Sequence, residues 1–254
     1  GSPMVIDIDN DELSMDIVYA DNAGYVHIID YLGNERTGWP FNTGDDIWGS
    51  PAVADIDNDS ELEIIVTSKS KSIYILSPSG TLETEYYANQ FLMGTPSIGN
   101  IDNDEEMEIV FAGYTPTGDV FAINHDGTLI DGFPVEINEK ILSGVALYDF
   151  NNNNKDDIVI ATESNNNVFL IYDDGSYENI FTASDKFKSA PSVFVINDEP
   201  IIIAGSYNGY VYGLNQIGDI HFFYNANSPI TTSAAFIKIS PLIIGIFFWN
   251  SRWI

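Results

Sequence analysis

The stretch Gly49–Val66, GSPAVADIDNDSELEIIV, decides the fold of this chain. An apolar run leads into three carboxylates at alternate positions, Asp55, Asp57 and Asp59, and a fourth, Glu63, follows four places later. Three β-branched residues come directly after the last acid. We therefore predict a tight loop between two antiparallel strands. Its alternating acids offer several hard oxygen ligands, which suit Ca²⁺ and no soft metal.

The features of this stretch recur along the chain with a period of about 46 residues. Entries made of a small residue and proline, or their equivalents, follow one another at intervals of 44 to 49 residues. Turn glycines recur in phase with these entries at Gly33, Gly80, Gly127, Gly175 and Gly218. Each glycine is preceded by a short strand-like segment: YVHII, SIYIL, DVFAI, NVFLI and YVYGL in turn. Two markers with one period indicate a repeat architecture.

Each repeat is predicted to hold four short strands, and no stretch of the chain has helical periodicity. The sequence thus predicts an all-β fold, a β-propeller of four-stranded blades in a single domain over residues 1–254. A β-sandwich is disfavoured because it does not repeat its turns at a fixed period. Five full repeats and a partial sixth are expected, at about 1–48, 49–93, 94–142, 143–188, 189–231 and 232–254. Closure as a ring, or membership of a larger propeller, stays open at this stage.

The composition excludes several classes of partner. The net charge is −29, from 38 acids and 9 bases, and 33 of the acids lie in residues 1–175. Such a chain lacks the basic footprint that nucleic acid requires, and anionic membrane surfaces are disfavoured for the same reason. The apolar runs are too short to insert into a membrane. Cysteine is absent, so thiolate chemistry and disulfides are excluded. No signal peptide opens the chain, and we expect a mature piece of a secreted protein.

Four successive repeats carry the acidic loop, and each offers oxygen ligands at alternate places and at a closing place. In chain order the predicted ligands are Asp7, Asp9, Asp11 and Asp16; Asp55, Asp57, Asp59, the Glu61 carbonyl and Glu63; Asn100, Asp102, Asp104, the Glu106 carbonyl and Glu108; and Asp149, Asn151, Asn153, the Lys155 carbonyl and Asp157. The first loop has a one-residue insertion, and repeats five and six have lost the pattern. We predict three to four Ca²⁺ ions, with the fourth site weakest. An EF-hand is rejected because its closing acid stands at place twelve, between helices.

The repeat resembles the FG-GAP/VCBS repeats of bacterial extracellular proteins and of integrin α-subunit propellers. The resemblance lies in Gly-Ser-Pro followed by Asp55-Ile-Asp-Asn-Asp-x-x-x-Glu63-Ile-Ile-Val. It implies a propeller whose hairpin loops bind Ca²⁺ through the matched positions. The family's Phe-Gly and Gly-Ala-Pro signature survives only as Gly-Ser-Pro or Gly-Thr-Pro. Its usual glycine at the sixth loop place is also replaced, by Glu12, Ser60, Glu105 and Asn154. A left-handed backbone there would cost ~1 kcal/mol.

The function that we expect is that of a non-enzymatic, extracellular or cell-surface module for recognition or adhesion, with structural calcium and no catalytic residue. A protein or glycan ligand is expected on the face opposite the acidic loops, with Trp48 and Tyr114 as candidate anchors. One alternative is an enzyme built on a propeller: a polysaccharide lyase, another carbohydrate-active enzyme or a quinoprotein-like dehydrogenase. A second alternative is an architectural spacer. His27 and the Trp39-Pro40-Phe41 segment are expected to pack within and between blades.

Overall fold

Residues 1–9, 14–240 and 243–247 are described by a computed structural model of the chain, and their regular structure consists of β-strands without a helix. Five antiparallel four-stranded sheets and one two-stranded sheet follow one another along the chain. The first sheet holds β1 (Met4–Ile6), β2 (Asp16–Ala20), β3 (Tyr25–Ile29) and β4 (Phe41–Asn42). The second holds β5 (Ala52–Ala54), β6 (Glu63–Thr67), β7 (Ser72–Leu76) and β8 (Leu82–Tyr87). The third holds β9 (Ser97–Gly99), β10 (Glu108–Ala112), β11 (Asp119–Ile123) and β12 (Val135–Glu136).

The remaining sheets continue this order. The fourth holds β13 (Ala146–Tyr148), β14 (Asp157–Ala161), β15 (Asn167–Ile171) and β16 (Tyr177–Thr182). The fifth holds β17 (Ser192–Ile196), β18 (Glu199–Gly205), β19 (Tyr210–Leu214) and β20 (Ile220–Asn225). The last is the pair β21 (Ala235–Ser240) and β22 (Ile243–Phe247). The prediction of an all-β chain built from repeated four-stranded sheets is confirmed, and the arrangement is propeller-like.

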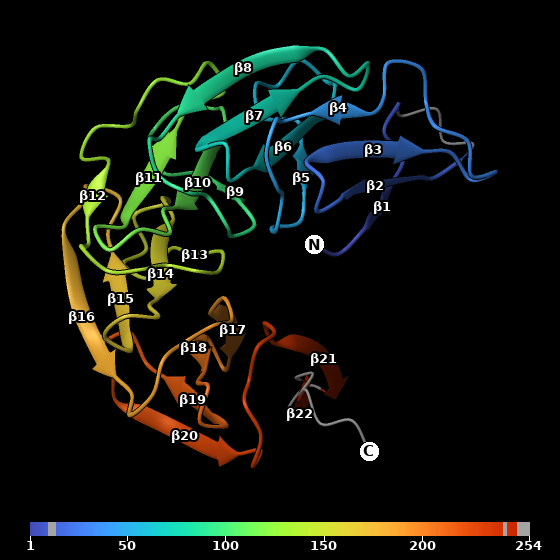
Figure 1. The fold of residues 1–254 in the computed structure, drawn as a ribbon. Helices are drawn as coiled ribbons and strands as arrows, with labels where there is room; N and C mark the ends of the chain where they lie inside the picture. Colours follow the sequence, from blue (N-terminus) through green and yellow to red (C-terminus); the bar gives the residue numbers. More distant parts are fainter. Residues whose placement is uncertain (10–13, 241–242, 248–254) are drawn as a thin grey trace.

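The sheets, which we call blades one to five, are arranged around a common centre with the first strand of each blade innermost and the fourth outermost (Figure 1). The inner strands of neighbouring blades pack against each other, β5 on β9, β9 on β13 and β13 on β17. The arc of blades stays open between the β21–β22 pair and β1 (Figure 1). No closed ring forms from the described residues.

The hydrophobic core lies between blades. Alternation along a strand sends every second side chain to the same face. The third strands therefore present one buried column, in which each side chain is at most 2% exposed: Val26, Ile73, Val120, Val168 and Val211. The apolar clusters join blades one and two, two and three, three and four, four and five, and blade five with β21–β22. Blades two to five thus bury both faces against their neighbours, and blade one buries the face that meets blade two.

Two packing predictions are confirmed. His27 stacks on Tyr19 with ring centroids 4.6 Å apart, in the column that holds aromatic rings elsewhere. Trp39 is buried, and its Nε1 donates a hydrogen bond of 2.9 Å to the Pro78 carbonyl in blade two. Phe133, the counterpart of Trp39 in blade three, belongs to the cluster between blades three and four. Both segments join blades, and for Trp39 this is the packing that the sequence predicts.

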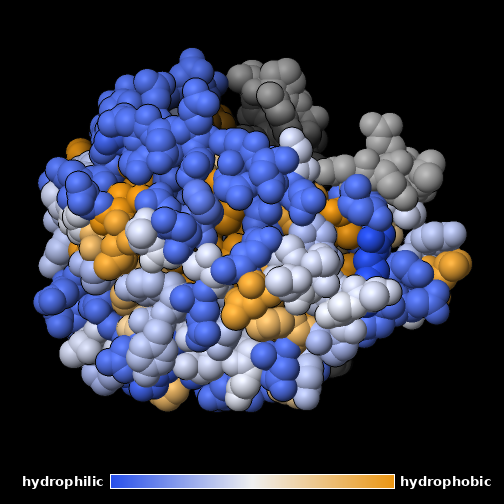
Figure 2. Space-filling model, turned by 90° about the horizontal axis from the view of Figure 1, so that it is seen from above, coloured by the Kyte–Doolittle hydropathy of each residue, from blue (hydrophilic) through white to orange (hydrophobic). Residues whose placement is uncertain are grey.

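The blade that lacks an acidic loop turns tightly, as expected. A two-residue turn, Asn197-Asp198, joins β17 to β18, and both residues have positive φ, 51° and 64°. This is the backbone of a type I′ hairpin, which Asn and Asp tolerate. The rim of the molecule is mostly hydrophilic, with hydrophobic residues in separate small patches (Figure 2). None of the described segments is a helix long and apolar enough to cross a membrane.

Candidate metal hairpins and the opposite face

The second acidic hairpin joins β5 to β6 and curls around its own carboxylates. Asp57 Oδ1 and Asp59 Oδ1 each accept the backbone N–H two residues further on, at 3.1 and 2.7 Å. Asp55 Oδ2 accepts the Ser60 N–H at 3.1 Å. These bonds turn the loop so that one oxygen each from Asp55, Asp57 and Glu63 lie within 4.8 Å of one another. These three carboxylates are among the predicted ligands of this hairpin; the fourth predicted carboxylate, Asp59, is not part of the group.

The third hairpin, between β9 and β10, also brings three of its carboxylates together. Asp102 Oδ1 accepts the Asp104 N–H at 2.9 Å, and Asp104 Oδ1 accepts the next N–H but one at 2.9 Å. Glu108 is fully buried at the start of β10, and its Oε2 accepts the Ile101 N–H at 2.5 Å. Oxygens of Asp102, Asp104 and Glu108 lie within 4.8 Å of one another. Each hairpin thus brings three carboxylates together, but at different loop places, because Asn100 stands in the third hairpin where the second has Asp55.

The closing acids are buried in an anionic setting. Burial, reinforced by nearby charge from Asp57, raises the pKa of Glu63 to about 7. Burial, reinforced by Asp102, raises the pKa of Glu108 to about 7. In the fourth hairpin, burial raises the pKa of Asp157 to about 6. Each of these carboxylates is costly in its ionised form without a compensating positive charge.

Several oxygens in these loops are buried without a hydrogen-bond partner. In the second and third hairpins they are Asp55 Oδ1, Asn100 Oδ1 and Glu108 Oε1; in the first, Asp16 Oδ2 also lacks a hydrogen-bond partner, while Asp16 Oδ1 pairs with Arg36. A buried polar atom without a partner is costly, and a bound ion is one of the explanations for such an atom. The donor set in the second and third hairpins is carboxylate and amide oxygen with carbonyls nearby, which is the set that Ca²⁺ takes. These residues fit that ion.

The fourth hairpin, between β13 and β14, gathers its predicted residues in a different way. Asn151 Nδ2 donates to Asp157 Oδ1 at 3.3 Å, so an amide lies where the second and third hairpins place a carboxylate. Asp149 accepts the N–H groups of Asn153 and Asn154 at 3.0 and 2.8 Å. The left-handed backbone expected at the sixth place is present here, with φ +66° at Asn154, and in the second hairpin at Ser60, with φ +77°.

The first hairpin contains a cation from the chain itself. Arg36 Nε lies 2.7 Å from Asp16 Oδ1, and Arg36 Nη1 lies 2.8 Å from Asp9 Oδ2. Asp9 and Asp16 are thus brought together as predicted, but around a guanidinium that sequence reasoning missed. In the sequence, the feature that could have drawn attention to Arg36 is its position three residues after the turn glycine Gly33. The predicted ligand Asp11 lies outside the described residues.

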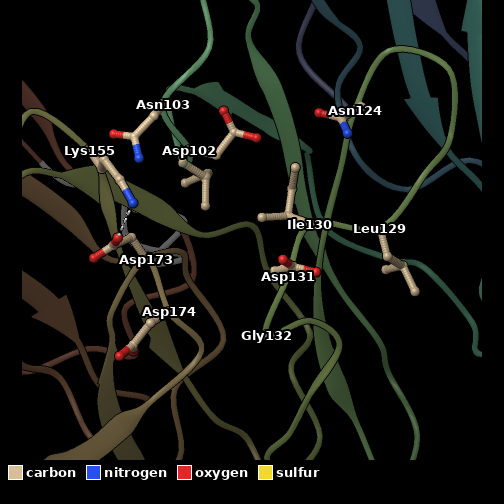
Figure 3. A pocket seen from close by; sticks show the side chains of 11 residues that line it. Asp102, Asn103, Asn124, Leu129, Ile130, Asp131, Gly132, Lys155, Asp173 and Asp174 are labelled. Carbon is tan, nitrogen blue, oxygen red and sulfur yellow. Dashed lines mark hydrogen bonds and ion pairs between the residues drawn. The ribbon is translucent and has the colours of Figure 1, made fainter.

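A cavity of about 530 Å³ adjoins the third hairpin on the same face. Figure 3 shows its walls, which include Asp102, Asp131, Asp173 and Asp174. Lys155, a predicted ligand through its carbonyl, points its amine to Asp173 Oδ2 at 2.8 Å. Its charge is thereby matched by one of the four acids. The cavity adds to the anionic character of the hairpin face.

The opposite face contains the two predicted anchors. Trp48 is 50% exposed and lines a cavity of about 620 Å³ whose walls are mainly Gly, Ser and Thr. The Tyr114 hydroxyl donates to Glu163 Oε2 at 2.7 Å, and this bond raises the pKa of Tyr114 to about 12. Tyr114 is therefore held in place by Glu163, whereas Trp48 is half exposed.

Lysines gather on this opposite face, and each one lies over an aromatic ring. The Nζ atoms lie 5.1 to 5.6 Å from a ring centroid, a distance typical of cation–π contact. The pairs are Lys69 with Trp48, Lys71 with Phe91, Lys140 with Tyr114, and Lys186 and Lys188 with Tyr207. The two faces thus differ in chemistry: one is acidic, and the other combines aromatic rings with lysines that pair with Asp46 and Glu163.

Comparison with solved structures supports an all-β, propeller-like fold. No family model and no curated protein matches the sequence. Among solved structures, the V. cholerae biofilm matrix protein Bap1 is similar at a TM-score of 0.68 and 19% identity, over 90% of this chain and 40% of that one. BBS1N in complex with ARL6DN is similar at 0.69 and 13%, over 98% and 74%. The Pseudomonas aeruginosa PilY1 C-terminal domain is similar at 0.61 and 16%, over 81% and 58%. The chain spans two fifths of the Bap1 chain, and these similarities concern the fold.

Proposed function

We propose that this chain is a calcium-stabilised, extracellular β-propeller module that serves in recognition or adhesion and does not catalyse a reaction. The observation that carries the calcium assignment is the convergence of three carboxylates in each of two hairpins, Asp55, Asp57 and Glu63 in blade two and Asp102, Asp104 and Glu108 in blade three. The structural similarity to a biofilm matrix protein supports the extracellular setting and the adhesive role.

Calcium would act as a structural ion. Like charges a few ångströms apart near a protein surface repel one another by roughly 1 kcal/mol or more per pair. A divalent cation among them removes that repulsion and ties the first strand of the blade to the second. For a dissociation constant near ~10⁻⁴ M, calcium at ~1 mM stabilises the fold by ~1.4 kcal/mol per site. Two sites would contribute a substantial part of the net stability of an ordinary domain.

The opposite face is the proposed ligand surface. Trp48 is exposed beside a polar cavity, and the Lys69 amine lies between the Trp48 ring and Asp46, 2.8 Å from a carboxylate oxygen of the latter. An exposed aromatic ring with adjacent charged and hydroxyl groups suits a protein or glycan ligand. Calcium in the hairpins would hold the blades whose loops form this face, without touching the ligand.

Calcium removal tests the structural role. The protein is melted after dialysis against EDTA and again in 1 mM CaCl₂, with 1 mM MgCl₂ as the matched control. We expect the melting temperature to be several degrees higher in calcium and little changed by magnesium, which demands a tighter octahedral site. Identical melts in EDTA and calcium would overturn the structural role.

A glycan and protein-ligand array, probed with the wild type and Trp48→Ala, tests recognition. A ligand that the wild type binds without altering it chemically, and that Trp48→Ala no longer binds, supports a recognition module. Unsaturated sugar products released from an acidic polysaccharide would instead indicate a lyase. Absence of binding to any soluble ligand would favour the architectural spacer.

A further inference from the structure

The four acidic hairpins differ in the group that lies between the residue at the third loop place and the residue at the closing place. These two residues face each other at the mouth of each hairpin. In the second hairpin both places hold carboxylates, Asp57 and Glu63, and in the third they hold Asp102 and Glu108. Within each pair the two acids converge, and no positively charged side chain of the described residues pairs with any of the four.

In the first hairpin the same two places are bridged by Arg36. One guanidinium contacts Asp16 Oδ1 through Nε and Asp9 Oδ2 through Nη1, at 2.7 and 2.8 Å. Asp16 is fully buried, so its ion pair is shielded from water on that side. The Arg36 backbone N–H donates to the Ile28 carbonyl at 2.8 Å, which fixes the start of the side chain beside the hairpin. The cation at this mouth is therefore built into the chain.

In the fourth hairpin the bridge is an amide. Asn151 Nδ2 donates to Asp157 Oδ1 at 3.3 Å, while Asn151 Oδ1 accepts the Asn153 N–H at 3.1 Å. The second bond fixes which end of the amide faces the closing acid. The one basic side chain of this hairpin, Lys155, is engaged by Asp173 outside the mouth. Two carboxylates and an inward-pointing donor replace the three carboxylates of the second and third hairpins.

We propose that this chain binds two calcium ions, in the second and third hairpins, and that Arg36 and Asn151 close the first and fourth hairpins in place of metal. A metal entering the first hairpin would have to displace a guanidinium that already compensates the buried Asp16, and it would leave Arg36 without its two carboxylate partners. A metal entering the fourth would meet an N–H₂ group where it needs an oxygen. The inference narrows the three to four ions that the sequence predicts, and it rests on the proposed calcium function.

The test counts calcium ions by native mass spectrometry and by calorimetric titration of the chelator-treated protein. We expect two ions for the wild type. Asp57→Asn copies the fourth hairpin into the second and should lower the count to one. Asn151→Asp restores the acid in the fourth hairpin and should raise the count to three. Arg36→Gln should also raise it to three, whereas Arg36→Lys keeps a cation in the first hairpin and should leave it at two.

The outcomes separate the inference from the function on which it rests. A wild type that binds no calcium overturns both. A wild type that binds three or four ions supports the calcium function and overturns the inference. The inference is also overturned if the wild type binds two ions and neither Arg36→Gln nor Asn151→Asp binds a third. Because Arg36→Gln leaves a buried acid without its partner and can destabilise blade one, Asn151→Asp, at an exposed loop position, keeps the inference testable.

Discussion

Glu108→Gln separates the two effects that the buried closing acid has on stability. Glu108 is fully buried, and its Oε1 has no hydrogen-bond partner. Glutamine is nearly isosteric, and its side-chain oxygen can keep the bond from the Ile101 N–H. The variant therefore removes the charge while leaving the shape of the hairpin. We expect it to stabilise the calcium-free protein and to reduce the response to calcium.

The magnitude of the first effect follows from the raised pKa. A carboxyl whose pKa is 4.5 in the unfolded chain and about 7 in the fold costs the folded state at most ~3.4 kcal/mol at pH 8. Water around the exposed Asp104 screens part of its repulsion with Glu108, so we take the stabilisation of the calcium-free protein by Glu108→Gln as ~2 kcal/mol. For a domain of this size the gain in Glu108→Gln corresponds to a rise in melting temperature of ~4–8 °C in EDTA.

The second effect has the opposite sign. Loss of one site removes ~1.4 kcal/mol of stabilisation by ~1 mM calcium, so the calcium-induced rise in melting temperature should shrink by ~3–6 °C. Thermal melts of wild type and Glu108→Gln at pH 8, in EDTA and in 1 mM CaCl₂, give both quantities. The matched control is Asp157→Asn, a buried closing acid in a hairpin without proposed calcium, whose calcium response should equal that of the wild type. A Glu108→Gln protein that is less stable than the wild type in EDTA, or that keeps the full calcium response, would refute the reasoning.

Three further outcomes are expected. In EDTA the free energy of unfolding should fall as pH rises from 4.5 to 7. The reason is that the raised pKa values of Glu63 and Glu108 let the folded state hold protons that the unfolded chain releases. Urea melts across this pH range would measure the fall, and a free energy of unfolding that rises with pH would contradict the prediction. Trp39→Phe, which loses the hydrogen bond to the Pro78 carbonyl, should cost ~1 kcal/mol in urea melts without changing the calcium count. Trp48→Ala should leave the melting temperature within ~1 °C of the wild type, since its side chain is half exposed, and a larger loss would assign Trp48 to the core.

The repeat and its strands could be predicted because they depend on local chemistry. The alternation along YVHII and its counterparts indicates which side chains lie in the core, and the buried column from Val26 to Val211 follows it. The turn glycines Gly33, Gly80, Gly127, Gly175 and Gly218 all have positive φ, between 80° and 86°. Glycine adopts this backbone without the steric cost of a side chain. Period and turn chemistry together place the strands within a residue or two.

The content of the hairpin mouths could not be predicted in the same way. Asp16 and Arg36 are separated by 20 residues and meet only because the turn after β3 folds back beside the first hairpin. The loop motif counts carboxylates and cannot show which of them already has a partner. Asn151 posed a similar problem, since an amide offers both an oxygen and a donor, and only the bond from the Asn153 N–H fixes which end points inward.

The hairpins are also linked to one another, which extends the consequence of a bound ion beyond its own loop. In the second hairpin, the Ile56 N–H donates to Glu63 Oε2 at 2.9 Å, and the Ile56 carbonyl accepts the Met107 N–H of the third hairpin at 3.0 Å. In the third, the Asn100 carbonyl accepts the Asp156 N–H of the fourth at 2.6 Å. An ion that fixes Glu63 therefore also fixes the backbone that supports the next hairpin. Calcium in the second and third hairpins would stiffen the contacts across blades two, three and four, and blade one, with its own cation, would need no metal to complete its first turn.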